Sequence, residues 1–89
     1  MLELRAKIHG RVHGVGFRAT TLRFARELKL KGIVSNSSDG TVEIIAQGEK
    51  KVLEELISML STVFGKRHIE KIDVHYTEPE QLYSGFSIN

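Results

Sequence analysis

The stretch that most constrains this chain runs from Ile8 to Arg18, IHGRVHGVGFR, where three glycines separate an alternating segment from a helical one. Glycine takes positive φ angles at no steric cost, so Gly10, Gly14 and Gly16 permit sharp turns. Successive N–H groups in such a turn, together with the unpaired N–H groups of the following helix, suit an anion. Arg18 adds a planar fork of donors that matches phosphate or carboxylate. The stretch alone leaves two interpretations open: an anion-binding loop, or a tight strand-to-helix turn with a surface arginine.

Residues 2–12 alternate between apolar and polar side chains, which is the period of a half-buried strand. Its apolar face carries Leu2, Leu4, Ala6, Ile8 and Gly10, and its wet, mostly basic face carries Glu3, Arg5, Lys7, His9 and Arg11. Residues 19–30 predict a helix, since apolar side chains recur at helical spacing until Gly32 ends the segment. Residues 33–38 and 41–47 predict two strands, because the Asp39-Gly40 pair between them is a strong hairpin signal.

The second half of the chain continues with a helix, a strand and a short terminal strand. Gly48 ends the preceding strand, and residues 50–64 predict a second helix that stops at Gly65. Its expected apolar stripe contains Leu53, Leu56, Leu60 and Val63, broadened by Val52, Met59 and Phe64. Residues 69–77 predict a strand that ends before Pro79. Its inward residues are expected to be Ile72, Val74 and Tyr76, and Phe86 and Ile88 indicate a short terminal strand.

This βαββαβ order predicts an α+β, ferredoxin-like sandwich: an antiparallel sheet with two helices on one face and a short extra C-terminal strand. With only 89 residues, we expect a single domain that covers residues 1–89. The first and second strands run in the same direction in this topology, so both end at the same edge of the sheet. We therefore expect Asn36 to approach Arg18, although 18 residues separate them in the sequence.

Composition excludes several kinds of chemistry. The chain has no cysteine, so it forms neither a disulfide nor a thiolate metal site. Its four histidines lack the spacing typical of metal ligands, and we expect no metal and no cofactor. No apolar run is long enough to span a bilayer, and the amino terminus lacks the apolar block of a signal peptide, so we expect a cytoplasmic protein. The formal charge of +2 favours anionic ligands.

Two other functions have partial support in the sequence. Residues 14–19 fit the G-x-G-x-x-A part of a dinucleotide fingerprint, but that motif needs a parallel sheet, which the Asp39-Gly40 hairpin argues against. An RNA-binding module shares the βαββαβ order, yet residues 41–47 offer no aromatic side chain on which a base would stack. A non-catalytic module that binds phosphate or the RNA backbone remains an alternative.

Two linked motifs resemble the acylphosphatase family. The run Gly10–Arg18 resembles the first signature, G-x-V-Q-G-V-x-F-R, and residues 32–36, followed by 39–42 and Gly48, resemble the second. The resemblance implies a hydrolase, an acylphosphatase of class EC 3.6.1.7, that cleaves the carboxyl-phosphate bond of acyl phosphates without metal or cofactor. It implies that Arg18 binds the phosphoryl group and that Asn36 holds the attacking water. The expected phosphate-binding loop contains His13, Gly14, Val15, Gly16, Phe17 and Arg18.

Three positions depart from the family pattern. His13 replaces the usual glutamine, Ile33 replaces the usual aromatic residue, and Ser35 replaces the common basic residue. These changes affect expected substrate affinity, pH dependence and packing, whereas Arg18 and Asn36 are retained. We expect the chain to act as a monomer on a small acyl phosphate, to release inorganic phosphate, and to use no nucleic acid or membrane partner. The sequence does not identify the physiological acyl group.

Overall fold

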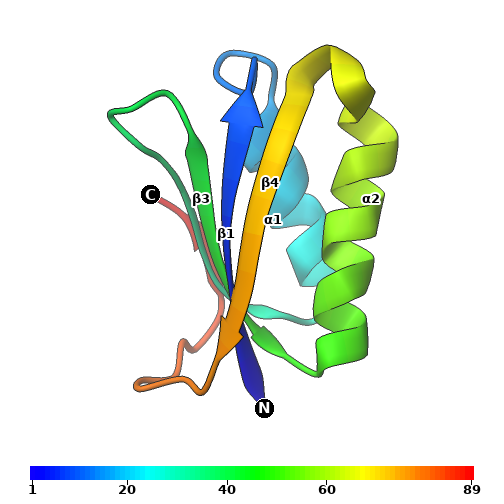
Figure 1. Ribbon diagram of the computed structural model, residues 1–89. Helices are drawn as coiled ribbons and strands as arrows, with labels where there is room; N and C mark the ends of the chain where they lie inside the picture. The colour runs from blue at the N-terminus through cyan, green and yellow to red at the C-terminus, as the bar shows by residue number, and fades with distance from the viewer.

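The computed structural model describes all 89 residues. The segments with alternating apolar residues form five strands, and the segments with helical spacing form two helices. The elements are β1 (Leu2–Gly10), α1 (Phe17–Glu27), β2 (Lys31–Asn36), β3 (Val42–Gly48), α2 (Lys50–His68), β4 (Ile69–Thr77) and β5 (Phe86–Ile88). The strands form one sheet in the order β4-β1-β3-β2-β5. Both helices lie on the same face of this sheet (Figure 1), which confirms the predicted ferredoxin-like α+β sandwich. No helix combines the length and the apolar character needed to cross a membrane.

The register of the sheet brings the ends of β1 and β2 to one edge. Both strands pair antiparallel with β3, and Val42 is paired with Ile8 on one side and with Asn36 on the other. The loop after β1 and the β2–β3 hairpin therefore lie together at the upper end of the sheet in Figure 1. The connection between β4 and β5 lies at the opposite end.

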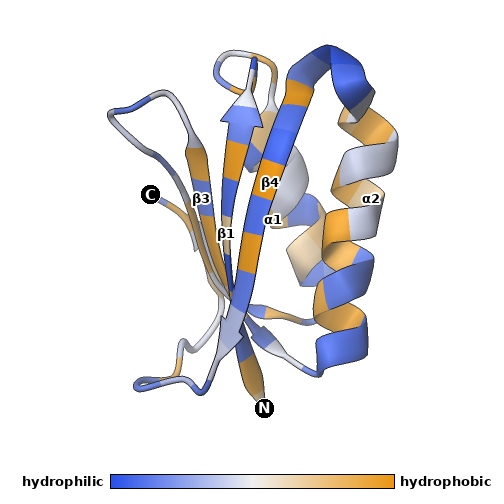
Figure 2. Ribbon diagram, in the orientation of Figure 1, coloured by the Kyte–Doolittle hydropathy of each residue, from blue (hydrophilic) through white to orange (hydrophobic).

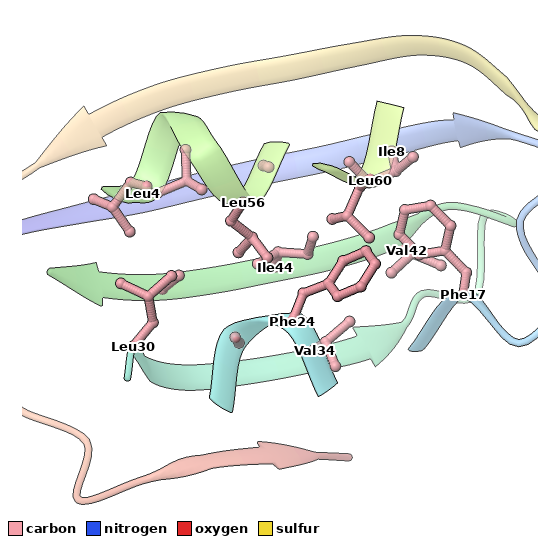
Figure 3. Packing of buried hydrophobic residues seen from close by; sticks show 14 of the residues in the cluster. Leu4, Ile8, Phe17, Phe24, Leu30, Val34, Val42, Ile44, Leu56 and Leu60 are labelled. Atoms are coloured by element: carbon pink, nitrogen blue, oxygen red, sulfur yellow. The ribbon is translucent and has the colours of Figure 1, made fainter. Parts of the chain in front are cut away.

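The core fills the space between the sheet and the two helices. Apolar and polar residues alternate along the strands in Figure 2, and the apolar residues of β1, β3 and β2 meet apolar faces of both helices. Figure 3 shows Phe17, Phe24, Leu56 and Leu60 among the strand side chains of this core. Burying one leucine-sized side chain stabilises a fold by about 1.5–3 kcal/mol. Burial of this single cluster therefore supplies most of the free energy that favours folding.

The ends of several elements differ from the predicted ones. Helix α1 begins at Phe17 and ends at Glu27, not over 19–30, because Lys29 takes a φ of 59° and turns the chain toward β2. Strand β2 begins and ends two residues earlier than predicted, since the hairpin starts at Ser37, whose N–H donates to the carbonyl of Thr41 over 2.8 Å. Gly65 breaks the regular helix as predicted, but one more turn follows it within α2.

Three predicted exposures were wrong, and the terminal strand makes the sheet mixed. Glu3 is only 2% exposed, although it belongs to the polar face of β1, because the chain after β4 covers this end of the sheet. Val63 is 56% exposed at the margin of the α2 stripe, and Val74 is 39% exposed on the edge strand β4. The terminal strand β5 pairs parallel with β2, so the five-stranded sheet is mixed and not wholly antiparallel.

Candidate active site

The loop between β1 and α1 is anchored at both ends. The N–H of Arg11 donates to the carbonyl of His68 over 2.8 Å, immediately after β1 ends. Gly16 closes the loop with a φ of 79°, and α1 begins at the next residue. Phe17 is 1% exposed and its ring packs 4.6 Å from that of Phe64 on α2, which holds the first turn of α1 in place.

This loop presents donors that no protein group uses. None of the N–H groups from His13 to Arg18 donates to a backbone or side-chain acceptor. No acidic residue lies in the first turn of α1, so no carboxylate neutralises the positive end of the helix dipole. Free N–H groups at a helix N-terminus favour an anionic ligand.

Arg18 lies in the first turn of α1, next to the last residues of the chain. Its Nη1 donates to the main-chain oxygen of Asn89 over 3.1 Å. The N–H of Asn89 in turn donates to the carbonyl of Val34 over 2.9 Å, which fixes this segment beside β2. This contact engages one nitrogen of the guanidinium, so the remaining donors of Arg18 stay available to a ligand.

Asn36 is the last residue of β2, and its side chain makes no hydrogen bond. The hairpin that follows relies on Asp39, whose Oδ1 accepts from the N–H of Thr41 at 3.1 Å and from its hydroxyl at 2.6 Å. Lys7 donates to the other carboxylate oxygen over 3.1 Å. The Thr41 hydroxyl, the Thr41 N–H and Lys7 hold the pKa of Asp39 well below its usual range. The amide of Asn36 is therefore not needed to close the turn.

A cleft of about 200 Å³ joins these groups. Its lining residues are Val12, Gly14, Gly16, Phe17, Arg18, Ala19, Asn36 and Ile88. The topological prediction that Arg18 and Asn36 meet at one sheet edge is confirmed, because both line this cleft. Two residues of the expected loop do not line it: His13 bonds the carbonyl of Thr41 at 3.0 Å, and Val15 is 37% exposed. Sequence reasoning missed Ile88, whose only signal was the alternation of the terminal strand.

A larger hollow of about 360 Å³ lies on the helix-free face of the sheet, but its charges neutralise one another. Lys7 contacts Asp39 at 3.1 Å and Glu43 at 3.9 Å. Asp73 accepts from His9 at 2.9 Å and lies 3.5 Å from Lys71; the hydrogen bond from His9 is the main cause that lowers its pKa. No group of three His, Cys, Asp or Glu side chains is placed to hold a metal. The smaller cleft is therefore the better candidate for an anionic ligand.

Comparison with known proteins points to one family. The family model for acylphosphatase matches residues 4–88. An acylphosphatase from Mycolicibacterium vanbaalenii is 38% identical over 86 residues, which cover 97% of this chain and 92% of that protein. An acylphosphatase from Chloroflexus aurantiacus is 43% identical over 81 residues, covering 91% and 88%.

Solved structures show the same likeness. The crystal structure of acylphosphatase from Bacillus subtilis superposes with a TM-score of 0.92 at 34% identity, covering 100% of this chain and 99% of that one. Full-length HypF in its phosphate- and nucleotide-bound form matches with a TM-score of 0.76 at 30% identity, but only 12% of its length is covered.

Proposed function

The chain belongs to the acylphosphatase family and is an acylphosphatase, and from that premise we propose how its residues divide the reaction. Acylphosphatases cleave the bond between the carboxyl oxygen and phosphorus of an acyl phosphate, with water as the second substrate. The loop from His13 to Arg18 binds the phosphoryl group, and Asn36 positions the water. The observation that carries this proposal is the cleft that Arg18 and Asn36 line together with Gly14 and Gly16.

Phosphoryl binding is assigned to the loop donors and to Arg18. Gly14, Gly16 and Phe17, whose N–H groups are free, line the cleft, and Arg18 adds a charged fork to the same lining. In phosphoryl transfer, negative charge is spread over the equatorial oxygens of the transferred group. Donors fixed around those oxygens stabilise that charge without reorganising during the reaction.

Asn36 is assigned to the attacking water. Asn36 lines the cleft, and its side-chain amide makes no hydrogen bond within the protein and offers both donors and an acceptor. Holding the water in line with the bond that breaks supplies orientation, which is worth a large part of a barrier of this kind.

Proton transfer needs no protein base in this proposal. No carboxylate and no imidazole line the cleft, so the proton of the water passes to an oxygen of the substrate's own phosphoryl group. The leaving group is a carboxylate, which is weakly basic and departs without a general acid. The same lining lacks carboxylate and imidazole ligands for a divalent cation, so no step is assigned to a metal.

Every residue with a proposed role comes from the same chain, and that chain has one hydrophobic core. We therefore propose that the protein is a single domain that acts as a monomer.

The test is phosphate release from benzoyl phosphate and acetyl phosphate in the presence of EDTA, with p-nitrophenyl phosphate as the monoester control. We expect both acyl phosphates to be hydrolysed and the monoester to be left nearly untouched. Loss of activity in EDTA that a divalent cation restores would overturn the proposed mechanism. Phosphate affinity without turnover would indicate a binding module instead. Affinity for RNA that falls steeply with salt would indicate a nucleic-acid module.

A further inference from the structure

We propose that His13 is a positioning residue: it ties the phosphate loop to the β2–β3 hairpin and so keeps the loop donors in register with Asn36. This inference rests on the proposed function. His13 does not line the cleft. It acts through the carbonyl of Thr41, which its Nε2 meets at 3.0 Å.

The loop has few other restraints. The N–H of Arg11 bonds His68 at its beginning, and the carbonyl of Gly16 accepts from the N–H of Thr20 at its end, over 3.0 Å. Between these two points the bond from His13 to Thr41 is the one hydrogen bond that involves the loop. Gly14 and Gly16 both take positive φ. Glycine populates positive and negative φ about equally, so the backbone of these residues does not itself hold this conformation. The loop conformation therefore depends on the contact of His13.

The partner of His13 is a firm reference point. Thr41 is 5% exposed, and its carbonyl also accepts from the N–H of Ser37 over 2.8 Å. Its N–H and hydroxyl are both held by Asp39. The next residue, Val42, is paired with Asn36 across the sheet. A loop fixed to Thr41 is thereby fixed relative to the side chain proposed to hold the water.

The chemistry of the bond specifies which side chains can replace histidine. A carbonyl only accepts, so Nε2 of His13 must carry the proton, as it does in the neutral Nε2–H tautomer and in the imidazolium. A glutamine, which the acylphosphatase signature carries at this position, offers an amide N–H of similar reach. Alanine offers no donor, so His13→Ala breaks the tie and His13→Gln keeps it.

The first experiment measures kcat and KM for benzoyl phosphate, together with the melting temperature, in three variants. We expect His13→Ala to lower kcat by about 10-fold or more, because a small misplacement of reacting groups costs that much. Its melting temperature should fall by roughly 5 °C or less, since one partly exposed hydrogen bond is lost. We expect His13→Gln to return kcat to within about threefold of wild type. His75→Ala, which removes an exposed histidine of β4, is the matched control and should behave as wild type.

A second experiment asks whether His13 acts through Thr41. Asp39→Ala frees Thr41, so the loss caused by His13→Ala should be several-fold smaller in that background than in the wild type. Equal losses in both backgrounds would overturn the path through Thr41. Normal kcat in His13→Ala, or a His13→Gln variant as slow as His13→Ala, would overturn the positioning role itself.

Backbone order parameters from NMR relaxation separate this inference from the proposed function. The order parameters of the Gly14 and Gly16 N–H vectors should be lower in His13→Ala than in the wild type, and the wild-type values should return in His13→Gln. If the wild type hydrolyses no acyl phosphate, the proposed function fails, yet these order parameters still decide whether His13 orders the loop. Unchanged order parameters in His13→Ala would contradict the inference whatever the enzyme does.

Discussion

The two ends of the sheet treat their polar groups in opposite ways. At the upper end in Figure 1, the loop after β1 and the end of β2 present N–H groups, a guanidinium and an amide that the protein leaves largely free. At the lower end, Glu3 and Gln47 are 2% and 1% exposed, and the hydrogen bonds of both are satisfied. The amide of Gln47 donates to Glu3 at 2.9 Å and to the carbonyl of Gln81 at 2.7 Å, while its oxygen accepts from the N–H of Tyr83 at 3.1 Å.

This difference separates what folds the protein from what binds the ligand. A buried polar group stabilises a fold only when its partners are present, as they are around Gln47. Free donors at the other end contribute nothing to the fold and are available to an anion. Burial alone would raise the pKa of Glu3, but hydrogen bonds from Gln47 and Arg5 and the charge of Arg5 outweigh it, and the pKa is lowered. We therefore expect substitutions at the upper end to change catalysis and those at the lower end to change stability.

The largest effect is expected at the cleft. Arg18→Ala should lower kcat/KM by about 10³-fold or more, the scale found when a phosphoryl-binding arginine is lost. Its melting temperature should stay within about 3 °C of wild type, since the side chain makes one hydrogen bond at the surface. Inorganic phosphate should raise the melting temperature of the wild type and not that of Arg18→Ala. Arg23→Ala, an exposed arginine of the same helix, is the control; equal protection in Arg18→Ala and wild type would place the anion elsewhere.

The next effect is expected at the opposite end. Gln47→Leu leaves groups of Glu3, Gln81 and Tyr83 without partners and should cost about 2–4 kcal/mol of unfolding free energy, measured by urea denaturation. The melting temperature should fall by roughly 10 °C or more. The kcat of the folded fraction should remain within twofold of wild type. Gln81→Leu is the control and should be nearly neutral, because the side chain of Gln81 is exposed and only its backbone carbonyl bonds Gln47. A Gln47→Leu protein with normal stability and a lowered kcat would contradict the assignment of stability to the lower end and catalysis to the upper end.

A smaller effect is expected from acid. Glu3 has a lower pKa in the folded protein than in the unfolded chain, so protonation favours unfolding. Its contribution to stability is present in full above about pH 4.3, the ordinary pKa of glutamate, and is lost as the pH falls further, through the folded-state pKa. Glu3→Gln should be less stable at pH 7 and should show a shallower loss between pH 5 and pH 2 in urea denaturation. Parallel curves for the two proteins would show that Glu3 does not carry this term.

The smallest effect is expected from a methyl group in the loop. Gly14 has a φ of 77° and open space around it, so Gly14→Ala costs about 1–2 kcal/mol from backbone strain and not from a clash. We expect a drop in melting temperature of several degrees and phosphate binding weakened a few-fold. Gly85→Ala, at a glycine without positive φ and with open space, is the control and should change neither. Tighter phosphate binding in Gly14→Ala would contradict this prediction and would show that a more rigid loop binds phosphate better.

Much of the fold follows from local pattern. Periods of two and of helical spacing, together with glycine and the Asp39-Gly40 turn, predict all seven elements, and β4 has the bounds that its alternation predicts. The shared edge of β1 and β2 follows from topology, which is why the meeting of Arg18 and Asn36 was predictable. The acylphosphatase family, too, was predictable from two motifs.

The features that were not predictable depend on distant partners. Glu3 is buried by Gln47, 44 residues away, and by the chain around Gln81, so alternation assigns its face correctly and its exposure wrongly. His13 bonds a carbonyl 28 residues along the chain, and nothing in the local sequence selects that acceptor. The parallel pairing of β5 with β2 likewise has no local signal in the sequence. It depends on the path that the chain takes across the covered end of the sheet before it reaches β5.

The central claim is that the cleft divides its work, with Arg18 and the loop binding phosphate and Asn36 placing the water. Asn36→Ala tests it most directly, with the melting temperature, the phosphate Kd and kcat measured on one preparation. We predict an unchanged melting temperature, because the amide makes no hydrogen bond, and a phosphate Kd within about threefold of wild type. We predict a kcat lowered by about 10²-fold or more. Near-normal turnover, with or without a loss of stability, would contradict the claim.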